Sequence, residues 1–313
     1  MKVFDAEAVR NGLPWPALVA ALREMFVTGC ESPPRPHYTI ETPDGPPATL
    51  LLMPAWRPGG PIGVKFVNVF PGNAARGLSA ISAAYILSDG TTGAMLAQID
   101  GGELTPRRTA AASVLAATFL ARPDSATLTV FGTGNVAANL IEAYAALFPI
   151  EAVRVVGRDP ERTRRFVQRF AHLPLCVEVG ADPERAVAGA DIVTAATLAT
   201  APIIPGAALS PGTHVDLVGG FRPDMREADD AVFERATFVA VDTREGALSE
   251  AGDLIQPLAS GVLDMARIKA DLFELCRGTR PGRTDPAEIT VFKSVGASLE
   301  DLAAASLLVQ QNA

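Results

Sequence analysis

A glycine-rich turn in the middle of the chain has the residue types and spacing of a phosphate-binding loop. The sequence Gly132-Thr133-Gly134-Asn135-Val136-Ala137 follows an apolar, β-branched run at residues 127–131 and precedes helix-forming residues up to Leu147. This strand–turn–helix pattern is typical of dinucleotide-binding sites, with Ala137 in the third small position. Gly132 suits the tight turn, Gly134 lets the backbone approach a pyrophosphate, and the helix N-terminus favours phosphate charge. An ordinary tight turn is the alternative interpretation.

The second strand of the same pattern bears on cofactor choice. A strand expected at residues 152–156 is followed by Gly157-Arg158-Asp159. At this position an acidic residue typically binds the ribose 2′-hydroxyl of NAD, whereas arginine suits the 2′-phosphate of NADP. Arg158 therefore favours NADPH over NADH. The alternative is a solvated arginine paired with Asp159 or Glu161.

Two adjacent arginines suggest an anion site earlier in the chain. Thr105 and Pro106 fit the N-cap and first position of a helix that runs to about Leu120, which places Arg107 and Arg108 in its first turn. Cations there oppose the helix dipole at about 0.3–1 kcal/mol each. We therefore expect at least one to face a bound carboxylate, the alternative being two solvated surface arginines.

Lys65 is a further candidate for this anion site. It interrupts an apolar run at residues 62–70, and strand alternation places it on the face shared with Val67 and Val69. A buried lysine needs an anion or loses its proton. The alternative is an edge-strand lysine that discourages aggregation. Arg35 lies in a proline-rich segment, where surface arginines are common, so it carries less information by itself.

Other catalytic chemistries find little support in the sequence. The three histidines and three cysteines show no metal-ligand or redox spacing, and no Gly-x-Ser-x-Gly motif occurs. We expect the cysteines to be small core residues in a reducing compartment. The histidines are His37, His172 and His214, and the cysteines are Cys30, Cys176 and Cys276.

Length and composition set the broad class of the protein. A chain of 313 residues favours about two domains, and 48% hydrophobic with 20% charged residues is enough for a large core. The net charge of −8 argues against a nucleic-acid partner. The charged N-terminus argues against a signal peptide, and prolines in the uncharged stretch at 192–213 argue against a membrane helix. We expect a cytoplasmic protein without a membrane partner.

The pattern of elements changes near residue 122. Before it, extended segments at 48–56, 62–70, 83–87 and 94–99 include a hairpin with a turn at 89–93. After it, strand-like runs at 126–131, 152–156, 192–196, 213–219 and 238–241 alternate with helical or loop segments. We predict an α/β protein: a Rossmann domain at 122–290, and an α+β domain at 1–121 joined by residues 291–313 with an apolar helix at 299–309.

Taken together, several stretches resemble the ornithine cyclodeaminase/μ-crystallin family, and the likeness covers nearly the whole chain. They are Met53–Ala55, Gly63–Lys65, Pro71–Asn73, Asp100–Gly101, Leu104–Ala111, the Gly132 turn, Ala190–Val193, Arg222–Glu227, Val291–Gly296 and Asp301–Ala303. The resemblance implies a homodimer whose first domain binds a small-molecule substrate and forms the dimer contact, with NAD(H) or NADP(H) on the Rossmann domain. It also assigns Arg35, Lys65 and Arg108 to the substrate carboxylate.

One departure from the family pattern bears on the reaction. Ornithine cyclodeaminases have an aspartate after the Gly-Gly pair, where this chain has Phe221. The sequence around it is most similar to the Δ1-pyrroline-2-carboxylate and Δ1-piperideine-2-carboxylate reductases. We therefore expect an NAD(P)H-dependent imine reductase that forms L-proline or L-pipecolate, with Lys65 as the catalytic residue. The residues expected at the cofactor are Gly132, Thr133, Gly134, Asn135, Val136, Arg158, Ala196, Thr197, Val218 and Lys293.

Three other functions remain open at this point. An amino acid dehydrogenase of the alanine type would use the same cations, and ornithine cyclodeamination is disfavoured by Phe221. A μ-crystallin-like binder of NADPH and a small ligand would have little need of three cations around one carboxylate. The proton donor also stays open among Lys65, Asp216 and water.

Overall fold

The chain forms two compact units in the computed structural model, which describes residues 1–43 and 45–312. Unit 1 comprises residues 1–108 and 297–313, and unit 2 comprises residues 109–296. The first boundary was expected after residue 121, just beyond helix α3 (Gly101–Leu120). The observed boundary, at Arg108/Thr109, falls inside this helix. The expected boundary at residue 290/291 falls inside strand β14 (Thr290–Lys293), which belongs to unit 2.

Unit 1 is built on a six-stranded sheet in the order β1-β6-β5-β4-β3-β2. β1 pairs with β6 in parallel, and the other neighbours are antiparallel. The predicted hairpin joins β5 to β6, and Asp89 Oδ1 accepts hydrogen bonds from the backbone of Thr91 and Thr92 in its turn. The strands are β1 (Lys2–Phe4), β2 (His37–Ile40), β3 (Ala48–Trp56), β4 (Ile62–Val69), β5 (Ile81–Ser88) and β6 (Met95–Asp100).

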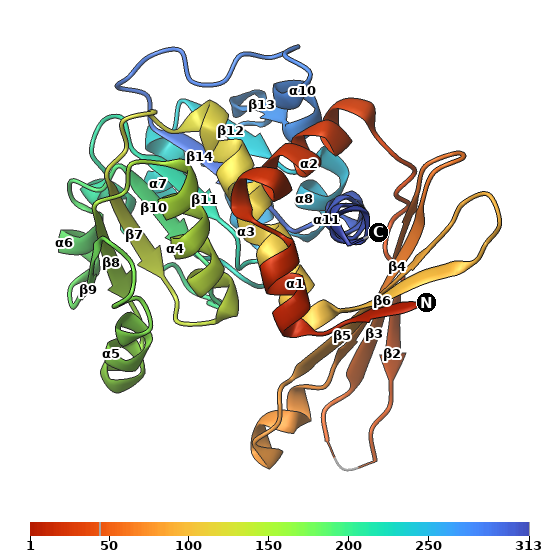
Figure 1. Ribbon diagram of the computed structural model, residues 1–313. Coiled ribbons are helices and arrows are strands. Elements are labelled where there is room, and N and C mark those ends of the chain that lie inside the picture. Colours follow the sequence, from red (N-terminus) through yellow and green to blue (C-terminus); the bar gives the residue numbers. More distant parts are fainter. Residues whose placement is uncertain (44, 313) are drawn as a thin grey trace. The chain divides into compact units, whose positions relative to one another are not determined.

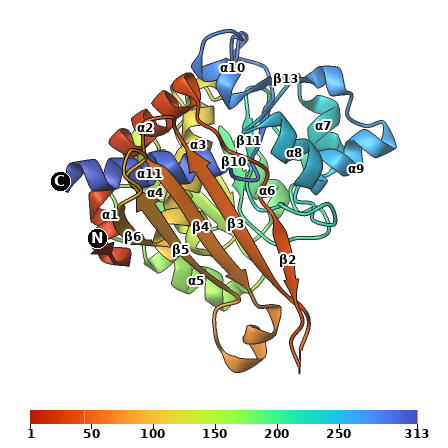
Figure 2. The same cartoon turned by 90° about the vertical axis from the view of Figure 1, so that its right-hand side faces the viewer.

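Helices cover one face of this sheet. The C-terminal helix α11 (Ser298–Gln311) contacts strands β3 to β6 as well as α2 (Trp15–Thr28) (Figure 2). The side chains that face inward from α2 include Leu18, Leu22 and Phe26, which are fully buried. α1 (Ala6–Gly12) and the short 3-10 helix η1 (Pro71–Arg76) complete unit 1. The fold thus places α11, from the far end of the sequence, directly on the strand that carries Lys65.

The predicted start of α3 at Thr105 is wrong. The helix begins at Gly101, and Asp100 Oδ1 accepts a 2.7 Å hydrogen bond from the Glu103 backbone N–H, as an N-cap does. Glycine at 101 is needed there, because a Cβ would lie 2.6 Å from the backbone of Ala83. Pro106 lies inside the helix, so the arginines after it are not in the first turn.

Unit 2 contains an eight-stranded parallel sheet in the order β13-β12-β14-β11-β10-β7-β8-β9 (Figure 1). From β9 to β11 the strands follow the Rossmann order 3-2-1-4-5, with the switch point between β7 and β10, and β14, the last strand in the chain, pairs with β11 at the sixth position. Three of these short strands, β9, β13 and β14, were not predicted. The strands are β7 (Thr127–Phe131), β8 (Ala152–Val156), β9 (Cys176–Val179), β10 (Ile192–Ala195), β11 (His214–Leu217), β12 (Phe238–Val241), β13 (Ile268–Asp271) and β14 (Thr290–Lys293).

Most helices of unit 2 start at an acidic or hydroxyl N-cap, whereas α4 starts at Gly134 without a side-chain cap. They enclose a core of strand side chains such as Val193, Val215 and Val239. The helical segments are α4 (Asn135–Leu147), α5 (Pro160–Gln168), α6 (Pro183–Val187), η2 (Gly206–Ala208), α7 (Asp230–Arg235), α8 (Arg244–Glu250), α9 (Gly252–Ser260), η3 (Met265–Arg267) and α10 (Leu272–Cys276).

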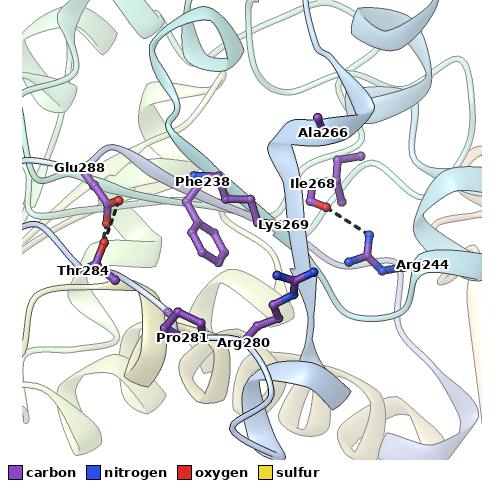
Figure 3. Close-up of a pocket in the computed structure, with 10 residues that line it drawn as sticks. Phe238, Arg244, Ala266, Ile268, Lys269, Arg280, Pro281, Thr284 and Glu288 are labelled. Atoms are coloured by element: carbon purple, nitrogen blue, oxygen red, sulfur yellow. Dashed lines mark hydrogen bonds between the residues drawn. The ribbon is translucent and has the colours of Figure 1, made fainter.

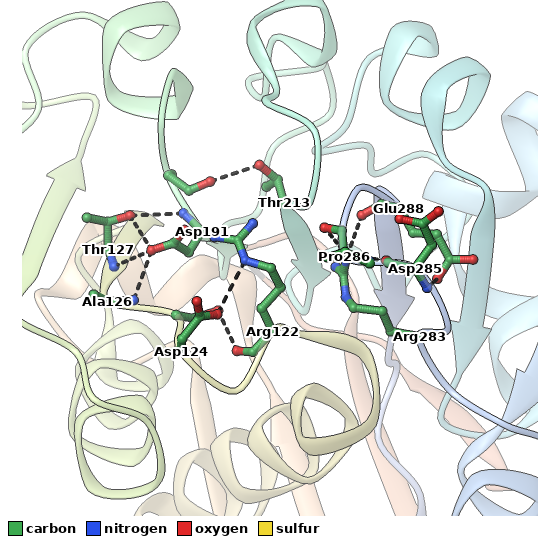
Figure 4. A network of polar contacts seen from close by, with 12 residues as sticks. Arg122, Asp124, Ala126, Thr127, Asp191, Thr213, Arg283, Asp285, Pro286 and Glu288 are labelled. Carbon is green, nitrogen blue, oxygen red and sulfur yellow. Dashed lines mark hydrogen bonds and ion pairs between the residues drawn. The ribbon is translucent and has the colours of Figure 1, made fainter.

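A polar network ties together the amino ends of the unit 2 strands (Figure 4). Asp191, just before β10, accepts hydrogen bonds from Ala126 N, Thr127 N and Thr127 Oγ1, and it pairs with Arg122. These donors hold the pKa of Asp191 below its usual value although burial opposes them. Thr213 Oγ1 donates to Ala190 O, 2.8 Å away. The network is therefore structural and lies at the edge opposite the carboxyl ends of the strands.

Two further expectations concern exposure. Cys30 and Cys276 are partly buried, but Cys176 is exposed, so its assignment to the core is wrong. The reason is that Cys176 is the first residue of β9, the edge strand of its sheet.

Within residues 1–43 and 45–312, no helix combines the length and the apolar character that crossing a membrane requires.

Candidate functional site

The glycine turn of unit 2 has the geometry of a phosphate-binding loop. Gly132 follows β7 with a φ of 119°, and a Cβ at this position would lie 2.8 Å from Ala196 O. Only glycine suits that combination of backbone conformation and close approach. At Gly134 a Cβ would meet nothing within 4 Å, and α4 starts there without a side-chain cap. An open helix N-terminus beside a glycine is suited to an anionic phosphate.

The tip of β8 presents basic side chains. Gly157 is closely packed, since a Cβ would lie 2.2 Å from Thr163 Oγ1. Arg158 is exposed, and Arg162 in the first turn of α5 is exposed as well. Asp159 instead caps α5, where its Oδ1 accepts hydrogen bonds from Glu161 N and Arg162 N. These backbone donors lower the pKa of Asp159, which remains an anion bound to its own helix.

In unit 1, Lys65 is buried on an interior strand rather than at an edge. Its neighbours in the sheet are Met53 on β3 and Tyr85 on β5, so the edge-strand interpretation is wrong. The side chain is on the same buried face as Val67, as predicted. Its Nζ lies 2.9 Å from Oδ1 and 2.8 Å from Oδ2 of Asp301 on α11. The anion that a buried lysine requires is therefore supplied by the protein itself.

Arg108 joins the same buried cluster. Its Nε donates to Asp301 Oδ1 at 3.0 Å, and its Nη1 donates to Glu300 Oε2 at 2.7 Å. Burial lowers the pKa of Arg108, but Asp301 and Glu300 more than offset this and keep the pKa above its usual value. Likewise burial raises the pKa of Asp301, while Lys65 and Arg108 together bring it below the usual value. The cluster is a charged network at neutral pH.

Lys65 has a lowered pKa within this network. Burial is the main cause, the positive charge of Arg108 adds to it, and Arg35 contributes in the same direction, so that the pKa falls to about 8 despite Asp301. The influence of Arg35 shows that this residue belongs to the same electrostatic neighbourhood; its Nη1 lies 4.0 Å from Met53 Sδ. The positive charges of Arg108 and Arg35 thus act on Lys65 in a cluster that also holds the carboxylates of Asp301 and Glu300.

Arg107 has a different role from Arg108. Its Nε and Nη2 donate to Leu13 O at 3.1 and 2.8 Å, and its guanidinium lies 4.2 Å from the centroid of the Trp15 ring. Both contacts are within unit 1 and serve packing. The expectation that the arginines oppose the helix dipole is wrong, because α3 begins earlier; the cluster with Asp301 and Glu300 is what fixes Arg108.

The carboxyl ends of β10, β11 and β14 bring together a buried network that the sequence did not reveal. Glu227 Oε1 accepts hydrogen bonds from Thr197 N and Oγ1, and its Oε2 accepts one from Gly219 N. Asp253 Oδ1 accepts from Glu227 N, and its Oδ2 lies 3.3 Å from Lys293 Nζ. Lys293, expected at the cofactor, thus directs its ammonium at Asp253 and is fully buried.

Asp216 is a buried carboxylate that is hydrogen-bonded within the fold, and it is not accessible to solvent. Its carboxylate accepts hydrogen bonds from Ser113 Oγ, Tyr144 OH and Thr194 Oγ1 at 3.0, 3.1 and 2.7 Å. Burial raises its pKa to about 6, and the three hydroxyl groups limit that rise. Its place in the interior of β11 suits the packing of α4 and β10 around that strand.

A cavity of about 430 Å³ in unit 2 lies beside β13, away from the glycine turn in the sheet order (Figure 3). Its lining contains the cations Arg244, Lys269 and Arg280, but Arg244 donates to Ile268 O and pairs with Glu274. The described side chains hold no group of three or more His, Cys, Asp or Glu residues able to bind a metal ion.

The sequence model of the ornithine cyclodeaminase/mu-crystallin family matches residues 9–313. A Δ1-pyrroline-2-carboxylate reductase of Paracoccus denitrificans is 42% identical over 97% of this chain and 90% of its own length.

Solved structures agree with this match along the whole chain. A Δ1-pyrroline-2-carboxylate reductase of Thermococcus litoralis, in complex with NADH and L-proline, has a TM-score of 0.92 at 30% identity and covers 99% of this chain and 97% of its own. An archaeal alanine dehydrogenase dimer with bound NAD has a TM-score of 0.89 at 27% identity, over 99% and 95% of the two chains. This chain therefore belongs to the ornithine cyclodeaminase/mu-crystallin family.

Proposed function

We propose that this protein is an NAD(P)H-dependent reductase that converts a cyclic ketimine carboxylate, Δ1-pyrroline-2-carboxylate or Δ1-piperideine-2-carboxylate, into L-proline or L-pipecolate. The observation that carries the proposal is the buried cluster of Lys65 and Arg108, with Arg35 in its electrostatic neighbourhood. Cations held in fixed positions in this way suit a substrate carboxylate. When bound, the dinucleotide supplies the hydride.

The mixed charges of the cluster also suit the rest of this substrate. A cyclic ketimine carboxylate is a zwitterion when its nitrogen is protonated, and the iminium carbon is then electrophilic without further activation. The chain therefore needs mainly to orient the carboxylate and hold the ring, with little demand for a strong acid. Asp301 and Glu300 fix the cations through buried ion pairs, which limits the side-chain entropy lost on binding. Lys65 is the proposed catalytic residue, because it combines contact with the carboxylate and an exchangeable proton.

Phe221 supports the reductase over a cyclodeaminase. This side chain follows Gly220 and is 37% exposed, so an apolar ring stands where a diamino acid substrate would require a carboxylate. A substrate without a second amine meets no unpaired charge there. The relative of Paracoccus denitrificans and the Thermococcus litoralis structure, both named Δ1-pyrroline-2-carboxylate reductases, favour the same choice.

We propose Gly132, Thr133, Gly134, Asn135 and Val136 as the residues that hold the dinucleotide phosphates. The open N-terminus of α4 and the close approach at Gly132 support this assignment. Arg158, with Arg162 nearby in sequence at the start of α5, favours the 2′-phosphate of NADPH over NADH. We propose Ala196, Thr197 and Val218 for the nicotinamide half of the cofactor. Lys293, which pairs with Asp253, would act on this half indirectly through that carboxylate.

A homodimer is part of the proposal, because unit 1 has an apolar sheet face opposite α11. We call this the outer face and define it by Leu52, Pro54, Trp56, Ile62, Val64, Phe66, Ala84 and Ile86, which lie side by side in the strand registers. Trp56, Ile62 and Phe66 are 37%, 37% and 42% exposed. An apolar area of this kind is typical of a subunit interface. The alanine dehydrogenase neighbour is described as a dimer.

The deciding experiment is a substrate panel with purified protein and either NADPH or NADH. We expect loss of the reduced dinucleotide with the five- or six-membered cyclic imine, and none with ornithine, whose conversion is followed as ammonia release. Turnover with pyruvate and ammonia alone would favour an alanine-type dehydrogenase. Ornithine conversion without imine reduction would refute the proposal, and dinucleotide binding without any turnover would favour a μ-crystallin-like binder.

A further inference from the structure

The network around Glu227 joins the turns at the carboxyl ends of two neighbouring strands of unit 2. Thr197 belongs to the turn after β10 and Gly219 to the turn after β11, and the Glu227 carboxylate accepts hydrogen bonds from both at 2.7 to 2.8 Å. Gly219 has no room for a side chain, because a Cβ would lie 2.1 Å from Thr197 O and 2.4 Å from Glu227 Oε1. The carboxylate is therefore a fitted link between the two turns.

Two further charged residues, Asp253 and Lys293, hold the backbone at Glu227 in place. Asp253, at the start of α9, accepts hydrogen bonds from Glu227 N and Ala228 N, at 2.8 and 3.0 Å. Lys293, at the end of β14, lies against the other oxygen of Asp253. Gly220 allows this approach, since a Cβ there would lie 2.7 Å from Asp253 Oδ2. The turns after β10 and β11 thus contact the Glu227 carboxylate, while α9 and β14 hold the backbone at Glu227.

The position of this link in the sheet indicates what it serves. In a Rossmann sheet the dinucleotide binds at the carboxyl ends of the strands and extends across the switch point. The β7–β8 side carries the glycine turn and Arg158, which suit the adenosine half, so the nicotinamide half is assigned to the β10–β11 side. The turns joined by Glu227 are on that second side.

We infer that Glu227 is a positioning residue that holds the turns after β10 and β11 together for the nicotinamide half of the cofactor. This inference rests on the proposed function. It predicts that losing the link weakens contacts with the nicotinamide half more than those with the adenosine half, because among the described residues the hydrogen bonds to the Glu227 carboxylate come from Thr197 and Gly219 and not from the glycine turn or Arg158.

The ionisation of Glu227 adds a pH dependence. Its three partners are all donors, so the carboxylate form fits them, and a proton on either oxygen removes an acceptor. Burial raises the pKa of Glu227 to about 7; Lys293 on β14 opposes the rise, and Asp253 on α9 adds to it. These are the charged groups that face it from the packed elements. The link is thus expected to weaken as the pH falls through about 7.

The test compares dinucleotides with their adenosine halves. NADH and ADP-ribose, and in parallel NADPH and 2′-phospho-ADP-ribose, are titrated into wild type and Glu227→Gln by calorimetry. We expect Glu227→Gln to lose about tenfold or more in dinucleotide affinity, because an amide donor then faces the Gly219 N–H, and to change less than about twofold for the adenosine halves. Asp224→Asn, an exposed acid in the same loop, is the matched control and should match wild type.

The pH profile separates positioning from a general structural role. As the pH is lowered from about 8 to about 6, the ratio of the dinucleotide affinity to the affinity for its adenosine half should fall in wild type. In Glu227→Gln this ratio should be low at every pH. Equal losses for both kinds of ligand, or no loss for the dinucleotides, would overturn the inference. A wild type that binds neither dinucleotides nor their halves would instead refute the proposed function.

A second pair of variants keeps the test decisive if Glu227→Gln fails to fold. Thr197→Val removes one hydroxyl donor to Glu227 and keeps the backbone donor, whereas Thr197→Ser keeps both. We expect a selective loss of about threefold to tenfold in dinucleotide affinity for the valine variant and recovery in the serine variant. Equal affinities in the two variants would overturn the inference.

Discussion

The ammonium of Lys65 lies 2.8 Å from Oδ2 of Asp301, although 236 positions separate the two residues in the chain. The same carboxylate receives Nε of Arg108. Asp301 therefore neutralises part of the charge of both cations, as a substrate carboxylate would if no acidic side chain were present. It keeps them charged and fixed in the buried cluster, while Glu300 supplies a second acid. The proposed carboxylate site is thus prepared by α11, and its stability depends on that helix.

Replacing Asp301 with asparagine should destabilise the protein strongly. The change leaves Lys65 and Arg108 buried with too little negative charge, a situation that typically costs about 3–5 kcal/mol. Urea unfolding at neutral pH measures the loss. Glu103→Gln, which breaks the exposed pair with Arg10, should cost no more than about 1 kcal/mol. Similar losses in the two variants would contradict a buried, interdependent cluster.

Lys65→Met should impair catalysis without affecting dinucleotide binding. Removing one charged contact to the carboxylate is expected to lower kcat/KM for the cyclic imine by about tenfold to a hundredfold. Because the pKa of Lys65 is lowered to about 8, mainly by burial, the ammonium is present below that pH and lost above it. The wild-type KM should therefore rise above about pH 8, and the rise should be missing in Lys65→Met. Lys269→Met, at an exposed lysine, is the control; an unchanged kcat/KM in Lys65→Met would remove Lys65 from the site.

Arg158→Ala should reduce the preference for NADPH. We expect the dissociation constant of NADPH to rise about tenfold or more, because a charge-assisted contact to the 2′-phosphate is lost, while that of NADH stays nearly constant. Fluorescence titration with both dinucleotides gives the comparison. Arg164→Ala removes an exposed arginine within α5, one that pairs with Glu161, and should leave both constants unchanged. Equal effects of Arg158→Ala on NADPH and NADH would argue against 2′-phosphate recognition.

The features that the sequence predicted are those set by local chemistry. The turn at Gly132 is readable because its conformation, the preceding strand and the following helix are contiguous. Lys65 was placed on a buried face by simple alternation. By contrast, a threonine–proline pair indicated a helix start at Thr105, but Gly101 and the Asp100 side chain start the helix a turn earlier. Here packing of Gly101 against β5 outweighed a local capping signal.

The parts that the sequence did not reveal depend on distant partners. Glu227 lies in an acidic, polar stretch that is typical of a surface loop, yet it is fully buried because Thr197, Gly219 and Asp253 surround it. The glycine pair at 219–220 was the available signal, since two adjacent glycines after a strand indicate that something must approach closely. Strand β14 was also missed. It joins the sheet between β11 and β12, and its four residues alone do not indicate that position.

Phe66→Glu should disrupt the proposed dimer. Phe66 is central in the outer face of unit 1, next to Leu52 on β3 and Ala84 on β5, and a buried unpaired charge would oppose association. We expect light scattering to show a dimer for wild type and a monomer for Phe66→Glu at micromolar concentration. Met265→Glu, at an exposed apolar residue of unit 2, should remain dimeric. A wild-type monomer, or a Phe66→Glu dimer, would exclude the outer face as the interface.

His214→Asn should make stability less sensitive to acid. The His214 ring is fully buried, its Nδ1 lies 2.9 Å from Thr290 Oγ1, and burial, with Arg283 adding to it, lowers the pKa to about 3. The neutral ring is favoured in the fold, so the unfolded chain takes up a proton first as the pH falls below about 6.5. Folding stability is therefore lost progressively between about pH 6.5 and pH 3, by an amount on the order of a few kcal/mol. Asparagine keeps a polar group for Thr290 but does not titrate. Urea unfolding at several pH values should show the difference in stability between wild type and His214→Asn shifting toward the variant as the pH decreases, whereas a difference independent of pH would mean that His214 is not buried in its neutral form.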